Sequence, residues 1–178
     1  MSTSYQFIGS TLVSLGKLEK SIVFFEKSSE LLKELVVGDS LNVSYKGVLA
    51  TLYEKIGNAY RLLGNEDEAL HFFKQYYTLE KELNSVDPRN VIFKNGLAIA
   101  YQYLGHMHTL RADLDSALVY FERYHQLEKE LNKDYPQNVE FKNGLAISCS
   151  KLGETHTLLG HLDTALTYFE QYCNLEKE

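Results

Sequence analysis

The sequence is short of the features that mark most other protein classes. Among its 178 residues are two prolines and two cysteines, too few for a linker-rich disordered chain or a disulfide framework. A formal net charge of −6 gives no attraction to nucleic acid or to an anionic membrane. No apolar run approaches the roughly 18 residues of a membrane helix, and the first residues lack the basic start and cleavage site of a signal peptide. We therefore expect a cytoplasmic protein without nucleic-acid or membrane partners.

The sequence does contain an internal repeat. The segment Phe93–Glu130 recurs 48 residues later as Phe141–Glu178, and the two copies agree at 24 of 38 positions without a gap. The same period extends over the whole chain through Gly9, Gly57, Gly105 and Gly153, and through Phe25, Phe73, Phe121 and Phe169. A fixed period of this size is typical of stacked-repeat proteins. We therefore predict one array over residues 1–178, with repeats near 1–41 (partial), 42–89, 90–137 and 138–178 (partial).

The apolar residues within each repeat have helical spacing. Leu97, Ala100 and Leu104 recur at intervals of three and four, which forms one stripe along a helix. A small residue followed by a capping side chain separates two such helices, and Asn65 with Glu68 resembles a capping box. Proline or asparagine marks the other junction. We predict an all-α chain with helices near 2–15, 18–36, 42–63, 66–84, 90–111, 114–132, 138–159 and 162–178.

The repeat resembles the tetratricopeptide repeat. The residues that carry the resemblance follow the order of that family's signature and are Tyr53, Ile56, Gly57, Tyr60, Gly64, Ala69, Phe73 and Pro88. The resemblance implies an α-solenoid of stacked antiparallel helical hairpins with a right-handed superhelical path. The chain departs from the family in two ways: its period is 48 instead of roughly 34 residues, and Cys149 stands in the last repeat where Tyr53 and Tyr101 open the signature. The 14 added residues correspond to about two turns in each helix, which keeps the same faces in contact.

The family resemblance also implies a binding surface, because the first helix of each hairpin lines a concave wall in that family. Carried over residue by residue, the positions facing a peptide or partner protein are Glu54, Lys55, Asn58, Arg61, Asn95, Gln102, Tyr103, His106, Thr109, Asn143, Ser150, Lys151, Glu154 and Thr157. Lys55, Arg61 and Lys151 favour an acidic partner. Glu54 stands where a lysine is needed for the clamp by which some family members hold a peptide's C-terminal carboxylate. These positions differ between the repeats, but solvent-exposed positions without any ligand would differ in the same way.

Other chemistry is disfavoured by the residues themselves. No nucleophile–base pair, phosphate-binding loop or metal-ligand cluster is apparent, so we expect neither an enzyme nor a cofactor or metal site. His108 and His156 replace an aromatic residue in the packing stripe. Gly57, Gly105 and Gly153 are predicted to lie opposite Ala69, Ala117 and Ala165, where two helices approach.

The two ends of the repeat array lead to a further expectation. Neither end carries the polar capping helix that solenoids normally have. The preferred interpretation is an interaction scaffold that forms part of a larger regulatory protein. The alternative is a structural array that forms a homo-oligomer head-to-tail through its terminal repeats.

Overall fold

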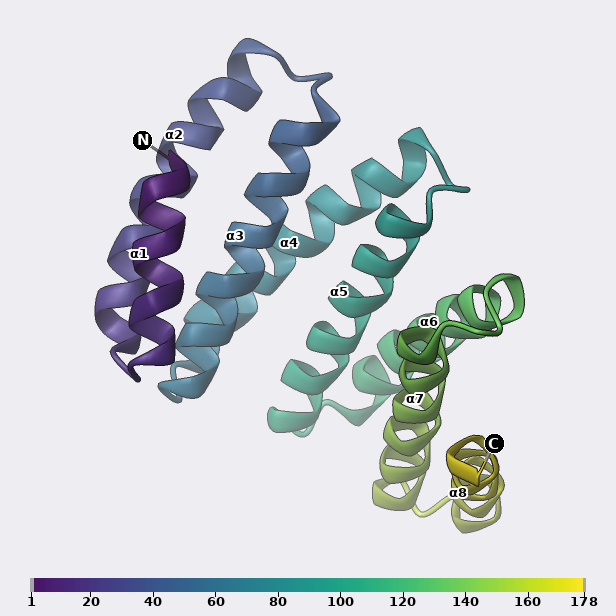
Figure 1. Ribbon diagram of the computed structural model, residues 1–178. Helices are drawn as coiled ribbons and strands as arrows, with labels where there is room; N and C mark the ends of the chain where they lie inside the picture. The colour runs from purple at the N-terminus through teal and green to yellow at the C-terminus, as the bar shows by residue number, and fades with distance from the viewer. Residues whose placement is uncertain (1, 178) are drawn as a thin grey trace. The chain divides into compact units, whose positions relative to one another are not determined.

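The computed structural model describes residues 2–177, and these form eight α-helices joined by short turns (Figure 1). The helices are α1 (Ser2–Ser14), α2 (Leu18–Gly38), α3 (Val43–Leu62), α4 (Glu66–Val86), α5 (Val91–Leu110), α6 (Leu114–Asp134), α7 (Val139–Leu158) and α8 (Leu162–Lys177). Each predicted helix is present, with boundaries within about two residues of the predicted ones. The all-α fold class is therefore confirmed. No helix in the described part of the chain is both long and apolar enough to cross a membrane.

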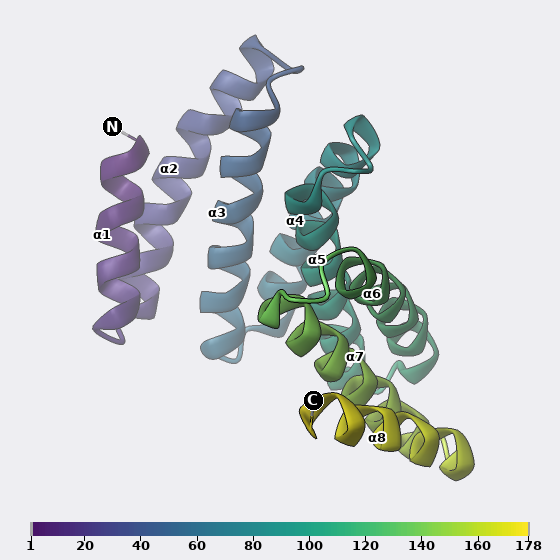
Figure 2. The ribbon, with the colours of Figure 1, turned by 45° about the vertical axis from the view of Figure 1, so that its right-hand side comes forward.

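The chain divides into two compact units, Met1–Asp87 and Pro88–Glu178. Unit 1 contains the hairpins α1/α2 and α3/α4, and unit 2 contains α5/α6 and α7/α8. In each unit the second helix of one hairpin also packs on the first helix of the next, α2 on α3 and α6 on α7 (Figure 2). Each unit is thus a pair of stacked antiparallel hairpins. That the two units form one array stays a prediction.

The turn inside each hairpin requires a residue in the left-handed backbone region. Gly16, Gly64 and Gly160 take φ values of 70°, 77° and 78°. Ala112 occupies the same place in the third hairpin with φ 57°, which is unfavourable for a residue with a Cβ. The turn after Ala112 is closed by the Asp113 N–H, which donates to the His108 carbonyl at 3.0 Å. The same turn is therefore built in all four hairpins, but one of them is strained.

Asparagine and aspartate side chains cap several helix N-termini as predicted. The Oδ1 atoms of Asn90 and Asn138 accept from backbone N–H groups at the starts of α5 and α7, and Asp113 accepts from the Ser116 N–H. The capping box predicted at Asn65 is wrong, because this side chain makes no capping hydrogen bond. The α4 N-terminus has three acidic residues in its first turn instead, and their charges interact favourably with the helix dipole.

Glycine and phenylalanine set the distance between the two helices of a hairpin. Phe121 on α6 is 1% exposed, and a Cβ added at Gly105 on α5 would lie 2.6 Å from its Cε1 atom. The prediction that Gly105 faces Ala117 is therefore wrong in its partner, although Ala117 is buried in the same contact region. The same glycine–phenylalanine contact recurs in the other three hairpins, at Gly9–Phe25, Gly57–Phe73 and Gly153–Phe169. These contacts need a residue without a side chain.

Candidate functional site

The predicted binding residues all lie on the first helices of their hairpins, and none of them is buried. Those of unit 1 lie on α3, and those of unit 2 lie on α5 and α7. Asn143, Glu154 and Thr157 are exposed, and the other eleven are half-buried. Half-burial on a helix face leaves these side chains accessible to a partner, so each unit is considered by itself below.

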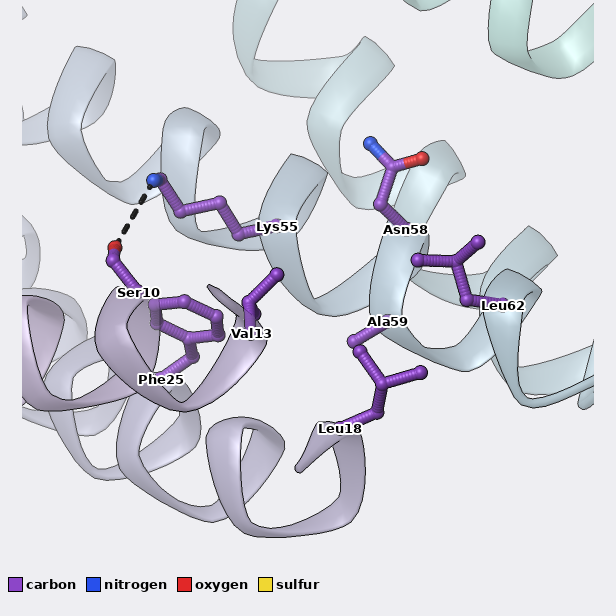
Figure 3. Close-up of a pocket in the computed structure, with 8 residues that line it drawn as sticks. All are labelled: Ser10, Val13, Leu18, Phe25, Lys55, Asn58, Ala59 and Leu62. Carbon is purple, nitrogen blue, oxygen red and sulfur yellow. Dashed lines mark hydrogen bonds between the residues drawn. The ribbon is translucent and has the colours of Figure 1, made fainter. Parts of the chain in front are cut away.

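Unit 1 has a cavity of about 300 Å³ beside two of the predicted residues (Figure 3). Its lining is contributed by α1, α2 and α3 and consists of Ser10, Val13, Leu18, Phe25, Lys55, Asn58, Ala59 and Leu62. Lys55 and Asn58 were predicted from the sequence, whereas Glu54 and Arg61 do not line the cavity. Five of the eight lining residues are apolar, so the cavity combines an apolar wall with a small number of polar groups. We call it the α1–α3 cavity.

Lys55 is the charged group of the α1–α3 cavity. Its Nζ atom donates to Ser10 Oγ at 3.4 Å and lies 5.7 Å from the centroid of the Phe25 ring (Figure 3). It has no ion-pair partner within residues 2–177. Because an ammonium group has three N–H donors and a hydroxyl is a neutral acceptor, Lys55 retains the capacity to bind an anionic group.

The Asn58 side chain is oriented by its neighbour on α3. Arg61 donates from Nε and Nη2 to Asn58 Oδ1, at 3.3 and 3.2 Å. This pair fixes the amide at the rim of the α1–α3 cavity. Arg61 therefore contributes to the site through Asn58.

In unit 2 the predicted residues on α7 bind one another. Lys151 Nζ lies 2.8 Å from Glu154 Oε2, and Ser150 Oγ donates to Glu154 Oε1 at 3.1 Å. Two repeats apart in the 48-residue register, Lys151 corresponds to Lys55 and Glu154 corresponds to Asn58. The α7 lysine therefore has its charge matched within its own helix, while Lys55 does not.

The two predicted threonines have a similar local role. Thr109 Oγ1 donates to the Gly105 carbonyl at 3.0 Å, and Thr157 Oγ1 donates to the Gly153 carbonyl at 2.8 Å. Both hydroxyl groups thus hydrogen-bond one turn back along their own helix. The two hydroxyl donors are therefore already engaged in the free protein.

The histidines of the packing stripe behave as predicted. The His108 ring stacks on Tyr120 with centroids 5.2 Å apart, and the His156 ring stacks on Tyr168 at 5.6 Å. His108 Nδ1 also lies 2.9 Å from Asp113 Oδ2. Within residues 2–177, no three His, Cys, Asp or Glu side chains gather in a geometry that could hold a metal ion.

Unit 2 also contains a buried carboxyl group that the sequence analysis missed. Glu128 on α6 is 3% exposed and packs against Gly144 on α7, where an added Cβ would lie 2.5 Å from Glu128 Cδ. Burial raises the pKa of Glu128 to about 7. The neighbouring Tyr124 hydroxyl donates to the Gly144 carbonyl at 3.1 Å. Glu128 is one of five polar residues in the segment 125–130, and the sequence gave no sign of which of them is buried.

Comparison with known proteins identifies the repeat. The sequence profile of the tetratricopeptide repeat matches residues 2–31 and 50–83, which correspond to the two hairpins of unit 1. These two segments of the chain are therefore tetratricopeptide repeats. The 48-residue register carries the same signature positions from these hairpins into unit 2. A comparison with curated protein sequences found no match.

Solved structures share the fold of this chain at low sequence identity. The crystal structure of BtubC (BKLC) from P. vanneervenii matches 99% of the chain with a TM-score of 0.79 and 16% identity. The chain spans 63% of the length of that protein. The crystal structure of MamA protein matches 99% of the chain, and 92% of its own length, with a TM-score of 0.51 and 19% identity. These likenesses concern the fold alone.

Proposed function

We propose that the chain is a protein-interaction scaffold and that its α1–α3 cavity binds a partner peptide. An apolar side chain of the peptide enters the cavity, and a carboxylate beside it pairs with Lys55. The observation that carries this proposal is the position of a lysine without an ion-pair partner at the rim of an apolar cavity. Tetratricopeptide repeats in general mediate binding between proteins, which supports the broader role.

The dimensions of the cavity support a small anchor. A volume of about 300 Å³ lies at the lower limit of ligand pockets and accommodates one large side chain but no cofactor. Peptide interfaces commonly concentrate their affinity in one or two such anchors. The apolar contact is made by Val13, Leu18 and Leu62, while Lys55 and Asn58 select for a polar group at the rim.

The predicted residues of unit 2 form a separate, second set of proposed contacts. Asn95, Gln102, Tyr103 and His106 lie half-buried on α5, and Tyr103 offers the largest contact area among them. A Tyr103→Ala variant tests this set. A loss of affinity for a selected partner of about tenfold is expected if Tyr103 is an anchor.

A peptide library tests the site in unit 1 without a known partner. Random peptides are selected on the wild-type protein and on the Lys55→Glu variant, with Lys74→Glu as a charge-matched control at an exposed position of α4. The wild type and the control should enrich peptides with an acidic residue next to a large apolar one. Lys55→Glu should lose these peptides, with affinities reduced about tenfold or more, because it replaces an attraction by a repulsion. The same peptides binding equally to all three proteins would contradict the proposal.

A further inference from the structure

Unit 2 contains a cavity that has no part in the proposed peptide site. It measures about 270 Å³ and lies among α6, α7 and α8. Its lining consists of His125, Lys129, Leu145, Cys149, Gln171, Asn174 and Leu175. We call it the Cys149 cavity.

The repeat register shows which residues of unit 1 correspond to this lining. Two repeats, or 96 residues, earlier in the chain the same places are held by Ser29, Lys33, Leu49, Tyr53, Gln75, Thr78 and Leu79. Four of the seven lining residues are identical in the two units, namely Lys129, Leu145, Gln171 and Leu175. Two differences change the volume of the lining most: Cys149 replaces Tyr53 and removes a ring, and His125 replaces Ser29 and adds one.

In unit 1 the corresponding place is filled by the tyrosine ring. Tyr53 is 6% exposed, and its ring centroid lies 6.0 Å from that of Phe72. Lys33 Nζ lies 5.6 Å from the centroid of the Tyr53 ring, within the range of a cation–π contact. In unit 1 this position is thus occupied by one aromatic ring, that of Tyr53, with the Lys33 ammonium over its face.

In unit 2 the Cys149 side chain is smaller than the tyrosine ring and is itself only 1% exposed. The His125 ring lies 5.9 Å from the ring of Tyr168, the counterpart of Phe72, and so occupies part of the place that Tyr53 fills in unit 1. Cys149 Sγ lies 3.8 Å from Gln171 Oε1 and 3.9 Å from His125 Nδ1. The His125 imidazole, which stands where unit 1 has Ser29, covers one side and is held there by Ser148 Oγ at 2.9 Å. A cavity of about 270 Å³ remains next to the cysteine in spite of this larger neighbour.

Lys129 is the one charged residue among those that line the Cys149 cavity. Burial lowers the pKa of His125 and raises the pKa of Cys149, so both side chains are neutral at pH 7. Lys129 has no ion-pair partner within residues 2–177. Apart from the Lys129 ammonium, which is available to a ligand, the lining is therefore neutral and partly apolar.

We propose that the Cys149 cavity binds a single aromatic ring of the phenol class. The ring occupies the place that Tyr53 fills in unit 1, with the Lys129 ammonium over its face. Cavities of about 150 Å³ left by the deletion of a buried apolar side chain are known to bind benzene, and this cavity is larger. The site is independent of Lys55, which lies in the other unit.

The test uses p-cresol, the side-chain analogue of tyrosine, titrated into the full chain by calorimetry. The wild type should bind it with a Kd of about 1 mM or tighter, as expected for a ligand of this size. Cys149→Tyr should weaken binding at least tenfold, because the tyrosine occupies the site as in unit 1. Cys173→Tyr provides the matched control, since Cys173 is the other free cysteine and is exposed on α8. Equal binding by the Cys149→Tyr variant, or no binding by the wild type, would overturn the proposal.

A second measurement needs no variant and remains informative if Cys149→Tyr does not fold. Saturating p-cresol should shift the amide signals of Leu145, Cys149 and Gln171, which line the cavity, and leave those of Ser10 and Lys55 unchanged. Unchanged signals of the lining residues would overturn the proposal. N-acetyl-tyrosine amide then distinguishes the source of the ring: affinity equal to that of p-cresol favours a tyrosine of a partner protein, and shifts with p-cresol alone favour a free phenol.

Discussion

A substitution of one hydrogen by a methyl group tests the helix packing within a hairpin. In Gly105→Ala the added Cβ would lie 2.6 Å from Phe121 Cε1 and 2.7 Å from Cδ1, closer than carbon atoms approach without movement. Phe121 is 1% exposed and has little room to move away. Overpacking of this kind costs about 1–3 kcal/mol. The replacement of glycine by alanine within a helix gains about 0.5–1 kcal/mol. The clash is the larger effect, so we expect a net loss of about 1–2 kcal/mol.

Gly47→Ala is the matched control for this substitution. Gly47 also lies inside a helix, α3, but nothing lies within 4 Å of an added Cβ there. Urea unfolding should therefore show a gain in stability for Gly47→Ala and a loss for Gly105→Ala. In the Gly105→Ala background, Phe121→Leu should cost less than it does alone, because the clash is relieved. Equal stabilisation by both alanines would refute the packing described for the hairpin.

Four further substitutions have expected outcomes. The pKa of Glu128 is raised from 4.5 to about 7 by burial, so the folded protein loses stability as the pH rises from about 4.5 to 7. At 1.36 kcal/mol per pKa unit this loss is about 3 kcal/mol. Glu128→Gln should remove this share of the pH dependence of urea unfolding between pH 4.5 and 8, while the share of Glu80, whose pKa burial also raises to about 7, remains. Gly144→Ala should destabilise unit 2 by about 2 kcal/mol or less, measured in the same way, because its Cβ meets the movable carboxyl end of Glu128 and alanine also gains helix propensity. Ala112→Gly should raise the midpoint of thermal unfolding and stabilise the chain by about 0.5–1 kcal/mol, because glycine adopts a φ of 57° without strain. Gly160→Ala should lower the midpoint, because it places a Cβ at a φ of 78°.

The sequence was sufficient to predict the helices because four copies of one pattern could be compared. Glycine in three of the four hairpin turns indicated a left-handed residue there, and Ala112 adopts the same conformation despite its side chain. The partner of Gly105 could not be predicted in this way. Phe121 has a phenylalanine counterpart in every repeat, and Ala117 has a small one in every repeat, alanine or Ser21. Only the rotation of α6 decides which of the two lies against the glycine.

The candidate site could be predicted in part. Lys55 and Asn58 followed from the family pattern because that pattern defines one face of the first helix. Val13 and Leu18 come from the neighbouring hairpin, and their counterparts one repeat later are Arg61 and Glu66, so no repeated pattern marked them. Lys151 forms an ion pair across one turn of α7, whereas Lys55 contacts Ser10 on α1, and the family pattern specifies neither contact.

The proposed site is tested most directly by locating a selected peptide on the protein with amide chemical shifts. A peptide enriched on the wild type and lost on Lys55→Glu should shift the amides of Ser10, Val13, Lys55 and Asn58, on α1 and α3. It should leave the amides that line the Cys149 cavity unchanged. Shifts confined to α6, α7 and α8, or spread evenly over both units, would contradict peptide binding in the α1–α3 cavity.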